Sequence, residues 1–264
     1  MAYRHHETPP FSLLLLYGGA GRRFGGDKGL AEFRGESLVA RLLRRMSGIS
    51  DDVFISSNAP ESYAPLGLRV IPDETPGLGP LGGLQAGLKA ARHDLLALVA
   101  GDMPFASPEL FRYLASEIGD ADVIVPTHGT ARRAGPRRGG RKQAISSADA
   151  LGGTDTSGSP DTPTRTDTPP NSGDEGNRPI FFEPLHALYH RRCLPAIEAT
   201  IAAHQRKITD VYPRARVRAV PESSWARVVG AAELVFANAN TPEELVCLEG
   251  TNAEGLRRGS RKRS

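Results

Sequence analysis

The sequence is poor in cysteine. Its 264 residues include only Cys193 and Cys247, which lie far apart and match no metal-ligand or disulfide spacing. Such isolated cysteines are typical of a reducing compartment, where a buried thiol acts as a small apolar side chain. We therefore expect a cytoplasmic protein.

Long apolar runs and a strong charge imbalance are also missing. No segment approaches the roughly 18–20 apolar residues that a membrane span needs. The first ten residues precede only about six apolar ones, too few for a signal peptide. A net charge of +3 does not favour nucleic-acid binding. With 39% apolar and 24% charged residues, the chain has the composition of a globular protein with no membrane association.

Glycine is concentrated in the stretch 11–29, which is the most informative part of the sequence for function. The stretch begins with the apolar run 13–16, which predicts a buried parallel strand. Three glycines and three basic side chains follow: Gly18, Gly19, Gly21, Arg22, Arg23 and Lys28. Glycines let backbone N–H groups approach an anion, and the cations add charge where a polyphosphate could bind.

Two common phosphate-binding motifs do not fit this loop. A Walker loop requires Gly-Lys-Ser/Thr, but Gly26 is followed by Asp27, and Lys28 by a glycine. A dinucleotide fingerprint would need a small residue where Phe24 stands. A plain glycine-rich turn with solvated charges remains the alternative on this stretch alone.

Strand and helix patterns alternate along the chain. Besides the first strand, the patterns predict strands at 52–58, 68–73, 93–102, 122–126, 179–189, 217–220 and 233–237. They predict helices at 37–47, 84–91, 107–117, 194–204, 208–212 and 241–245, with a turn at 35–37 and a stiff loop at 75–83. This alternation predicts an α/β fold: a Rossmann-like, three-layer α/β/α arrangement with a mostly parallel sheet.

One segment has a different composition. Residues 130–177 contain almost no aromatic or large aliphatic side chains, so we predict a disordered low-complexity insertion. Its first part is basic and could touch nucleic acid or a polyphosphate, but a solvated insertion is favoured. The predicted organisation is a flexible N-terminus (1–10), one domain formed by 11–129 and 178–248, the insertion (130–177), and a flexible basic tail (249–264).

Polar groups follow several predicted strands. Asn58, Asp73 and Asp102 come at or after strand ends, and the glycine-rich loop follows the first strand. Because the carboxyl ends of parallel strands form one edge of the sheet, these groups can converge on one ligand. Phosphate-directed donors beside an aspartate suit a nucleoside triphosphate with Mg²⁺.

The motifs resemble those of the molybdenum cofactor guanylyltransferase (MobA-like) nucleotidyltransferase family. The resemblance covers the loop 16–30 and five later motifs: Ile-Pro-Asp (71–73), Gly-Pro-Leu-Gly-Gly-Leu (79–84), Gly-Asp-Met-Pro (101–104), Glu-Pro-Leu-His-Ala-Leu-Tyr (183–189) and Asn-Ala-Asn-Thr-Pro-Glu-Glu-Leu (238–245). It implies the nucleotidyltransferase fold and Mg²⁺-dependent transfer of GMP from GTP to Mo-molybdopterin, releasing pyrophosphate. Gly18-Gly19 resembles the guanylyl-selective members, whereas cytidylyl-selective members tend to carry Ala-Gly there.

The resemblance also implies roles for single residues. The set expected to bind nucleotide is Leu16, Tyr17, Gly18, Gly19, Lys28, Ser56, Asn58, Asp73 and Asp102. Arg22, Lys28 and Asp102 are the implied catalytic residues, with Asp102 binding Mg²⁺, and Asn238 and Asn240 face molybdopterin. Molybdoenzyme maturation proteins are implied as further partners. In-line transfer needs positioning and charge neutralisation rather than a protein nucleophile, so the lack of a Ser/His/Asp arrangement is expected.

The sequence departs from the family pattern at three places. Tyr17 stands where a small alanine is usual, the loop is one residue shorter between Gly26 and Asp27, and Ser56 replaces an expected Asn. A cytidylyl- or sugar-nucleotidyltransferase of the same fold, or a non-catalytic GTP-binding accessory protein, are the alternatives.

Overall fold

The computed structural model describes residues 8–17, 27–74, 77–129 and 180–251. Its main sheet contains eight strands: β1 (Phe11–Leu16), β4 (Val53–Ser56), β5 (Arg69–Ile71), β6 (Leu95–Ala100), β7 (Val123–His128), β8 (Phe181–Phe182), β9 (His186–His190) and β10 (Val217–Val220). The spatial order is β10-β7-β9-β6-β1-β4-β5, and β8 pairs with β7. Only β8 and β9 run antiparallel to their neighbours within the described residues, so the prediction of a mostly parallel sheet is confirmed.

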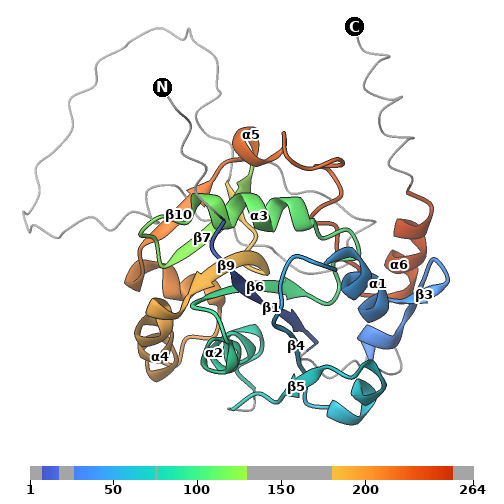
Figure 1. The fold of residues 1–264 in the computed structure, drawn as a ribbon, viewed down its shortest axis with the longest axis horizontal. Helices are drawn as coiled ribbons and strands as arrows, with labels where there is room; N and C mark the ends of the chain where they lie inside the picture. Colours follow the sequence, from blue (N-terminus) through green and yellow to red (C-terminus); the bar gives the residue numbers. More distant parts are fainter. Residues whose placement is uncertain (1–7, 18–26, 75–76, 130–179, 252–264) are drawn as a thin grey trace, which may run out of the picture.

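Helices cover both faces of the sheet (Figure 1). Alternate residues of β1 point to opposite faces because side chains alternate along a strand. Leu13 and Leu15 pack with α1 (Leu38–Arg45) and α3 (Pro108–Glu117), whereas Leu14 and Leu16 pack with α2 (Pro80–Ala90). On the same two faces lie α5 (Glu222–Trp225) and α4 (Leu194–Ala202), respectively. The predicted three layers are present.

Helix starts follow the capping residues of the sequence. The side chains of Ser37, Ser107 and Thr241 accept hydrogen bonds from the backbone N–H groups three residues later, at the starts of α1, α3 and α6 (Pro242–Glu249). Each side chain satisfies one of the N–H groups that a helix start leaves without a partner. The three predicted N-termini are therefore confirmed.

The loop predicted at 75–83 is wrong in its second half, because α2 begins at Pro80. Proline fits a first helical position, where its missing N–H is no loss. Gly83, predicted to lie in the loop, is a helical residue packed against β1. A Cβ at this position would lie 3.1 Å from the Ser56 hydroxyl oxygen and would overlap the side chain of Leu16. Glycine here permits close helix–sheet contact.

Two strand predictions are corrected. The run 179–189 is not one strand but β8 and β9, separated by a turn in which the N–H of His186 donates to the carbonyl of Glu183. The segment 233–237 forms turns instead of a strand, with the N–H of Ala237 donating to the carbonyl of Leu234. Its apolar side chains are buried beneath other elements, which explains their strand-like pattern.

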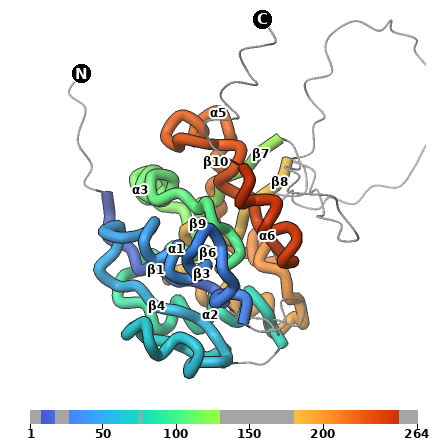
Figure 2. Tube along the Cα trace, turned by 90° about the vertical axis from the view of Figure 1, so that its right-hand side faces the viewer, coloured from blue at the N-terminus to red at the C-terminus, as the bar shows by residue number. Residues whose placement is uncertain are grey.

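The turn predicted at 35–37 is a small hairpin, β2 (Glu32–Phe33) and β3 (Glu36–Ser37), which packs beside α6 (Figures 1 and 2). The Arg34 guanidinium donates to the backbone carbonyls of Glu249 and Thr251 at the end of α6. These contacts join the hairpin to the C-terminal end of the described chain. The predicted insertion (130–177) and most of both predicted tails lie outside the described residues.

Short 3₁₀ turns complete the structure. They are η1 (Lys28–Leu30), η2 (Pro60–Ser62), η3 (Ala64–Leu66), η4 (Arg191–Cys193) and η5 (Ile208–Arg214). None of the helices in the described ranges combines the length and apolar character that a bilayer span requires.

Candidate active site at the carboxyl end of the sheet

The carboxyl ends of three adjacent parallel strands bring the predicted residues to one edge. The Tyr17 N–H donates to the carbonyl of Ser56 at 2.9 Å, and the Gly101 N–H donates to the carbonyl of Leu16 at 3.0 Å. The ends of β1, β4 and β6 are thereby held level. In open α/β sheets this edge is where ligands bind.

Lys28 and Asp102 form the central ion pair of this edge. The Lys28 Nζ lies 2.9 Å from the Asp102 Oδ2, and the two side chains are 23% and 19% exposed. Asp102 follows β6, and Lys28 opens η1, whose N-cap Asp27 accepts a hydrogen bond from the Gly29 N–H. The structure therefore joins two of the three predicted catalytic residues. The third, Arg22, lies outside the described residues, as do Gly18 and Gly19.

Only one of the two Asp102 carboxylate oxygens, Oδ2, contacts Lys28. The other oxygen, Oδ1, is buried and, within the described part of the chain, has no hydrogen-bond partner. A buried carboxylate oxygen without a donor is costly, so it favours a cation or a donor brought by a ligand. No three His, Cys, Asp or Glu side chains of the described residues gather into a metal site. One carboxylate nevertheless suits Mg²⁺, which keeps several waters and is completed by substrate phosphates.

Tyr17 lies beside this ion pair. Its side chain is 9% exposed and is flanked by Gly29 and Gly101, which adjoin Lys28 and Asp102. A Cβ on Gly29 would lie 2.8 Å from the Tyr17 ring, and one on Gly101 would lie 2.6 Å from the Tyr17 Cζ. The Tyr63 ring centroid is 5.3 Å from that of Tyr17.

Tyr63 in turn contacts Asp27, the N-cap of η1, which begins at Lys28. Its hydroxyl donates to the Asp27 Oδ1 at 2.5 Å. Burial, with a smaller contribution from this hydrogen bond, raises the Tyr63 pKa, so the phenol remains protonated and able to donate. Sequence reasoning missed Tyr63 and the packing role of the two glycines. The large side chain at position 17 could have indicated this packing, because a ring at this position needs neighbours without side chains.

A second polar group lies at the ends of β4 and β5. The Ser56 hydroxyl donates to the Asp73 Oδ1 at 3.2 Å, and the Asn58 side-chain amide donates to the Asp73 Oδ2 at 3.4 Å. The Asn58 Oδ1 accepts from the Asp73 N–H at 3.1 Å. Both polar residues at the end of β4 thus contact Asp73, whereas the sequence left open which of them would serve.

The segment around Asn238 and Asn240 reaches the same edge from the C-terminal side. Between them, the Ala239 N–H donates to the carbonyl of Asp102 at 3.1 Å. The Asn240 N–H donates to the Glu244 Oε2 in the first turn of α6 at 2.6 Å. The backbone between the two asparagines therefore contacts the backbone of Asp102, and the contact of Asn238 and Asn240 with a second substrate stays a prediction.

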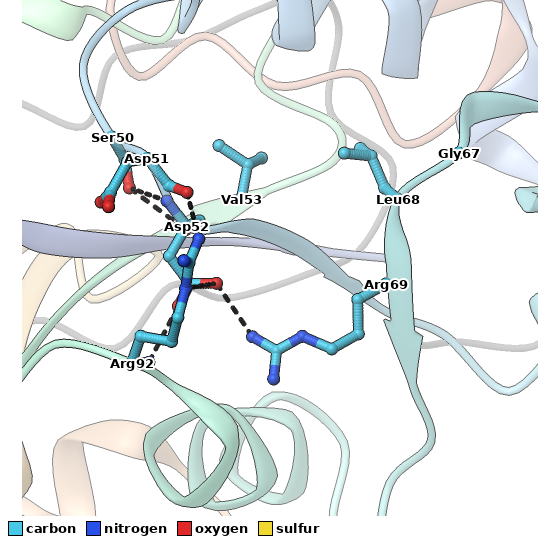
Figure 3. A pocket seen from close by; sticks show the side chains of 8 residues that line it. All are labelled: Ser50, Asp51, Asp52, Val53, Gly67, Leu68, Arg69 and Arg92. Carbon is cyan, nitrogen blue, oxygen red and sulfur yellow. Dashed lines mark hydrogen bonds and ion pairs between the residues drawn. The ribbon is translucent and has the colours of Figure 1, made fainter.

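The opposite edge of the sheet has a pocket with a different character (Figure 3). It has a volume of about 580 Å³ and is lined by residues at strand starts, among them Asp52, Arg69 and Arg92. The Asp52 carboxylate lies 3.0 Å from Arg69 Nη2 and 3.2 Å from Arg92 Nε, and it accepts from the Ser12 hydroxyl at 2.6 Å. Because these charges satisfy one another at the amino ends of the strands, we assign this cluster to stability.

Comparison with known proteins gives a consistent picture. Residues 13–222 match the family model described as a MobA-like NTP transferase domain. A protein of Pelotomaculum thermopropionicum named a probable molybdenum cofactor guanylyltransferase is 32% identical over 233 residues, which cover 88% of this chain and 89% of that protein. A molybdenum cofactor guanylyltransferase of Pseudomonas fluorescens is 48% identical over 99 residues, covering 36% of this chain and 50% of that protein.

A solved structure matches the fold at lower sequence identity. Molybdopterin-guanine dinucleotide biosynthesis protein A from Archaeoglobus fulgidus superposes with a TM-score of 0.61 and 21% identity. The match covers 94% of this chain and all of that one. At this identity the likeness concerns the fold.

Proposed function

Because this chain belongs to the MobA-like NTP transferase family, we propose that it transfers the GMP group of GTP to Mo-molybdopterin and releases pyrophosphate. The product is the guanine dinucleotide form of the molybdenum cofactor. The names of the relatives supply the substrates, and the Lys28–Asp102 pair at the carboxyl edge of the sheet is the observation that carries the proposal. This pair puts a cation and an anion where a polyphosphate and its metal would bind.

Each partner of the ion pair has a task when the nucleotide binds. In the structure Lys28 and Asp102 neutralise one another at 2.9 Å. With GTP bound, the Lys28 ammonium contacts the phosphates and stabilises the charge that develops as pyrophosphate leaves. Asp102 is then free to hold Mg²⁺, which when bound supplies neutralisation of the phosphate charge.

The transfer requires no protein nucleophile. An ionised oxygen of the terminal molybdopterin phosphate forms a bond to the α-phosphorus of GTP while the bond from that phosphorus to the bridging oxygen breaks. The electron pair leaves with pyrophosphate, and no proton has to be removed from the attacking oxygen. The chain's task is therefore alignment and electrostatics, which matches a site made of Lys28, Asp102 and backbone groups.

The remaining site residues have proposed roles on either side of this pair. Leu16, Tyr17 and Gly18 would line the base and ribose, and Arg22 would contact the triphosphate. The other residues proposed to contact the nucleotide are Gly19, Ser56, Asn58 and Asp73. Asn238 and Asn240 would bind molybdopterin. The hydrogen bonds that Ser56 and Asn58 make to Asp73 support their action as one group.

The rest of the organisation belongs to the same proposal. We propose one catalytic domain formed by 11–129 and 178–248, with 1–10 and 249–264 as flexible ends and 130–177 as an insertion dispensable for catalysis. A cytoplasmic location and delivery of the product to molybdoenzyme maturation proteins complete it.

A pyrophosphate-release assay tests the proposal. The purified protein with GTP, Mg²⁺ and molybdopterin should turn over, and Asp102→Asn should lower kcat by roughly 10³-fold, the scale for removing a group that stabilises transition-state charge. Asp120→Asn is the matched control, since this carboxylate is 94% exposed and lies away from the edge. A variant lacking 131–177 should retain activity.

Three outcomes would contradict parts of the proposal. Equal turnover with CTP would remove the base assignment. Binding of GTP without any turnover would indicate an accessory protein instead of an enzyme. Loss of activity on deleting 131–177, with the variant still folded, would show that the insertion takes part in catalysis.

A further inference from the structure

The Tyr17 ring packs against the backbone beside both partners of the proposed catalytic pair. The ring contacts Gly29, next to Lys28, and also Gly101, next to Asp102. Neither glycine could carry a side chain without moving the ring. The backbones that bear Lys28 and Asp102 therefore both lie in close contact with this aromatic ring.

The Tyr17 hydroxyl is buried and, among the described residues, has no hydrogen-bond partner. The Cζ atom that carries it lies 2.6 Å from where a Gly101 Cβ would be, so the hydroxyl lies beside the backbone that leads into Asp102. The Asp102 Oδ1 is in the same condition, buried and without a partner in the described part of the chain. A donor without an acceptor therefore lies near an acceptor without a donor.

We propose that the Tyr17 hydroxyl is a positioning donor that holds the Asp102 carboxylate once Lys28 has moved to the nucleotide phosphates. The inference rests on the proposed function. In the structure the Lys28 ammonium donates to the Oδ2 atom of the Asp102 carboxylate. When this contact is exchanged for the phosphates, the carboxylate loses its donor, and the phenol is the nearby buried group that can replace it.

The protonation state of Tyr17 is compatible with this role. Burial, and then the charges of Asp102 and Asp27, raise the Tyr17 pKa well above its usual value. The phenol therefore keeps its proton and can only donate to a carboxylate. Groups that hydrogen-bond a metal-binding carboxylate fix its direction, and their loss typically weakens metal binding by about 10-fold or more.

Tyr17→Phe in the full chain tests the inference, because it removes the hydroxyl and keeps the ring. The measurement is the Kd for Mn²⁺ in the presence of GTP, followed by electron paramagnetic resonance of the free ion. We expect this Kd to rise about 10-fold. The melting temperature of the ligand-free variant should be unchanged or higher, since a buried donor without an acceptor has been removed. A purely structural tyrosine would not combine these two effects.

Tyr212→Phe is the matched control. The Tyr212 hydroxyl is also buried, but it lies beside Tyr189 and belongs to η5 on the other face of the sheet. This variant should bind Mn²⁺ and GTP like the wild type. An Mn²⁺ affinity of Tyr17→Phe within twofold of wild type, or an equal loss in Tyr212→Phe, overturns the positioning role alone. Failure of the wild type to bind Mn²⁺ with GTP overturns the proposed function and this inference with it.

Discussion

Replacing Gly101 by alanine should force the Tyr17 ring out of its place. Gly101 is not among the described residues with positive φ, so alanine is allowed by the backbone, and the cost is steric. The new methyl group would lie 2.6 Å from the Tyr17 Cζ and closer still to two other ring atoms. Overpacking of this kind costs about 1–3 kcal/mol, and we expect about 2 kcal/mol here because three ring atoms are affected.

The steric origin of this cost is tested by removing the ring. Tyr17→Ala alone should destabilise by about 3–5 kcal/mol, as for other buried aromatic residues. In that background Gly101→Ala should cost almost nothing, since the methyl group enters the vacated space. The double-mutant cycle should therefore give a coupling energy of about 2 kcal/mol.

Urea unfolding measures all four proteins. The chain has a single tryptophan, Trp225, which is fully buried, so its fluorescence reports on loss of the core. Gly230→Ala serves as the control, because a Cβ there meets nothing within 4 Å. Additive free-energy changes for Gly101→Ala and Tyr17→Ala would refute the reasoning, as would an equal cost for Gly230→Ala.

Two further predictions concern charges away from the nucleotide. Burial lowers the pKa of His186 to about 3, so between this value and the unfolded value of about 6.5 the unfolded chain binds the extra proton and stability falls with falling pH. His186→Phe, which keeps the stacking on Phe111, should remove about 2 kcal/mol of this loss between pH 7 and pH 5, and parallel pH–stability curves for the two proteins would contradict it. Asp52→Ala should lower the free energy of unfolding by about 2 kcal/mol, because Arg69 and Arg92 lose their carboxylate, while GTP affinity by thermal shift stays unchanged. A loss of GTP affinity would mean that the Asp52 cluster influences nucleotide binding at the carboxyl edge of the sheet.

Local signals in the sequence were sufficient where one residue decides the conformation. Ser107 followed by Pro108 predicted the start of α3, and the helix runs over 108–117 as expected. A continuous apolar run predicted β6, since a central parallel strand is buried on both faces. In both cases the information lies within a few neighbouring residues.

Contacts between distant segments caused the errors. The segment 233–237 has the composition of a strand, but its apolar side chains, including Phe236, fill space beside Trp225 without a strand edge to pair with. Gly82 and Gly83 suggested a loop, yet both lie in α2, where Gly83 lets the helix approach β1 closely. An apolar segment that packs against a distant element has the same sequence pattern as a strand, and a glycine that permits close helix packing looks the same in the sequence as a loop glycine.

The candidate site illustrates the same limit more sharply. Lys28 and Asp102 could be named from their motifs, but the close contacts of Gly29 and Gly101 with the Tyr17 ring could not, because Tyr17 is distant from Gly101 in the sequence. A Cβ on Gly29 would also meet the Tyr63 hydroxyl, whereas the three nearest atoms to a Cβ on Gly101 all belong to Tyr17. In this chain the tyrosine ring and the two glycines pack as one unit, so replacing Tyr17 alone by alanine would leave a cavity beside Gly29 and Gly101.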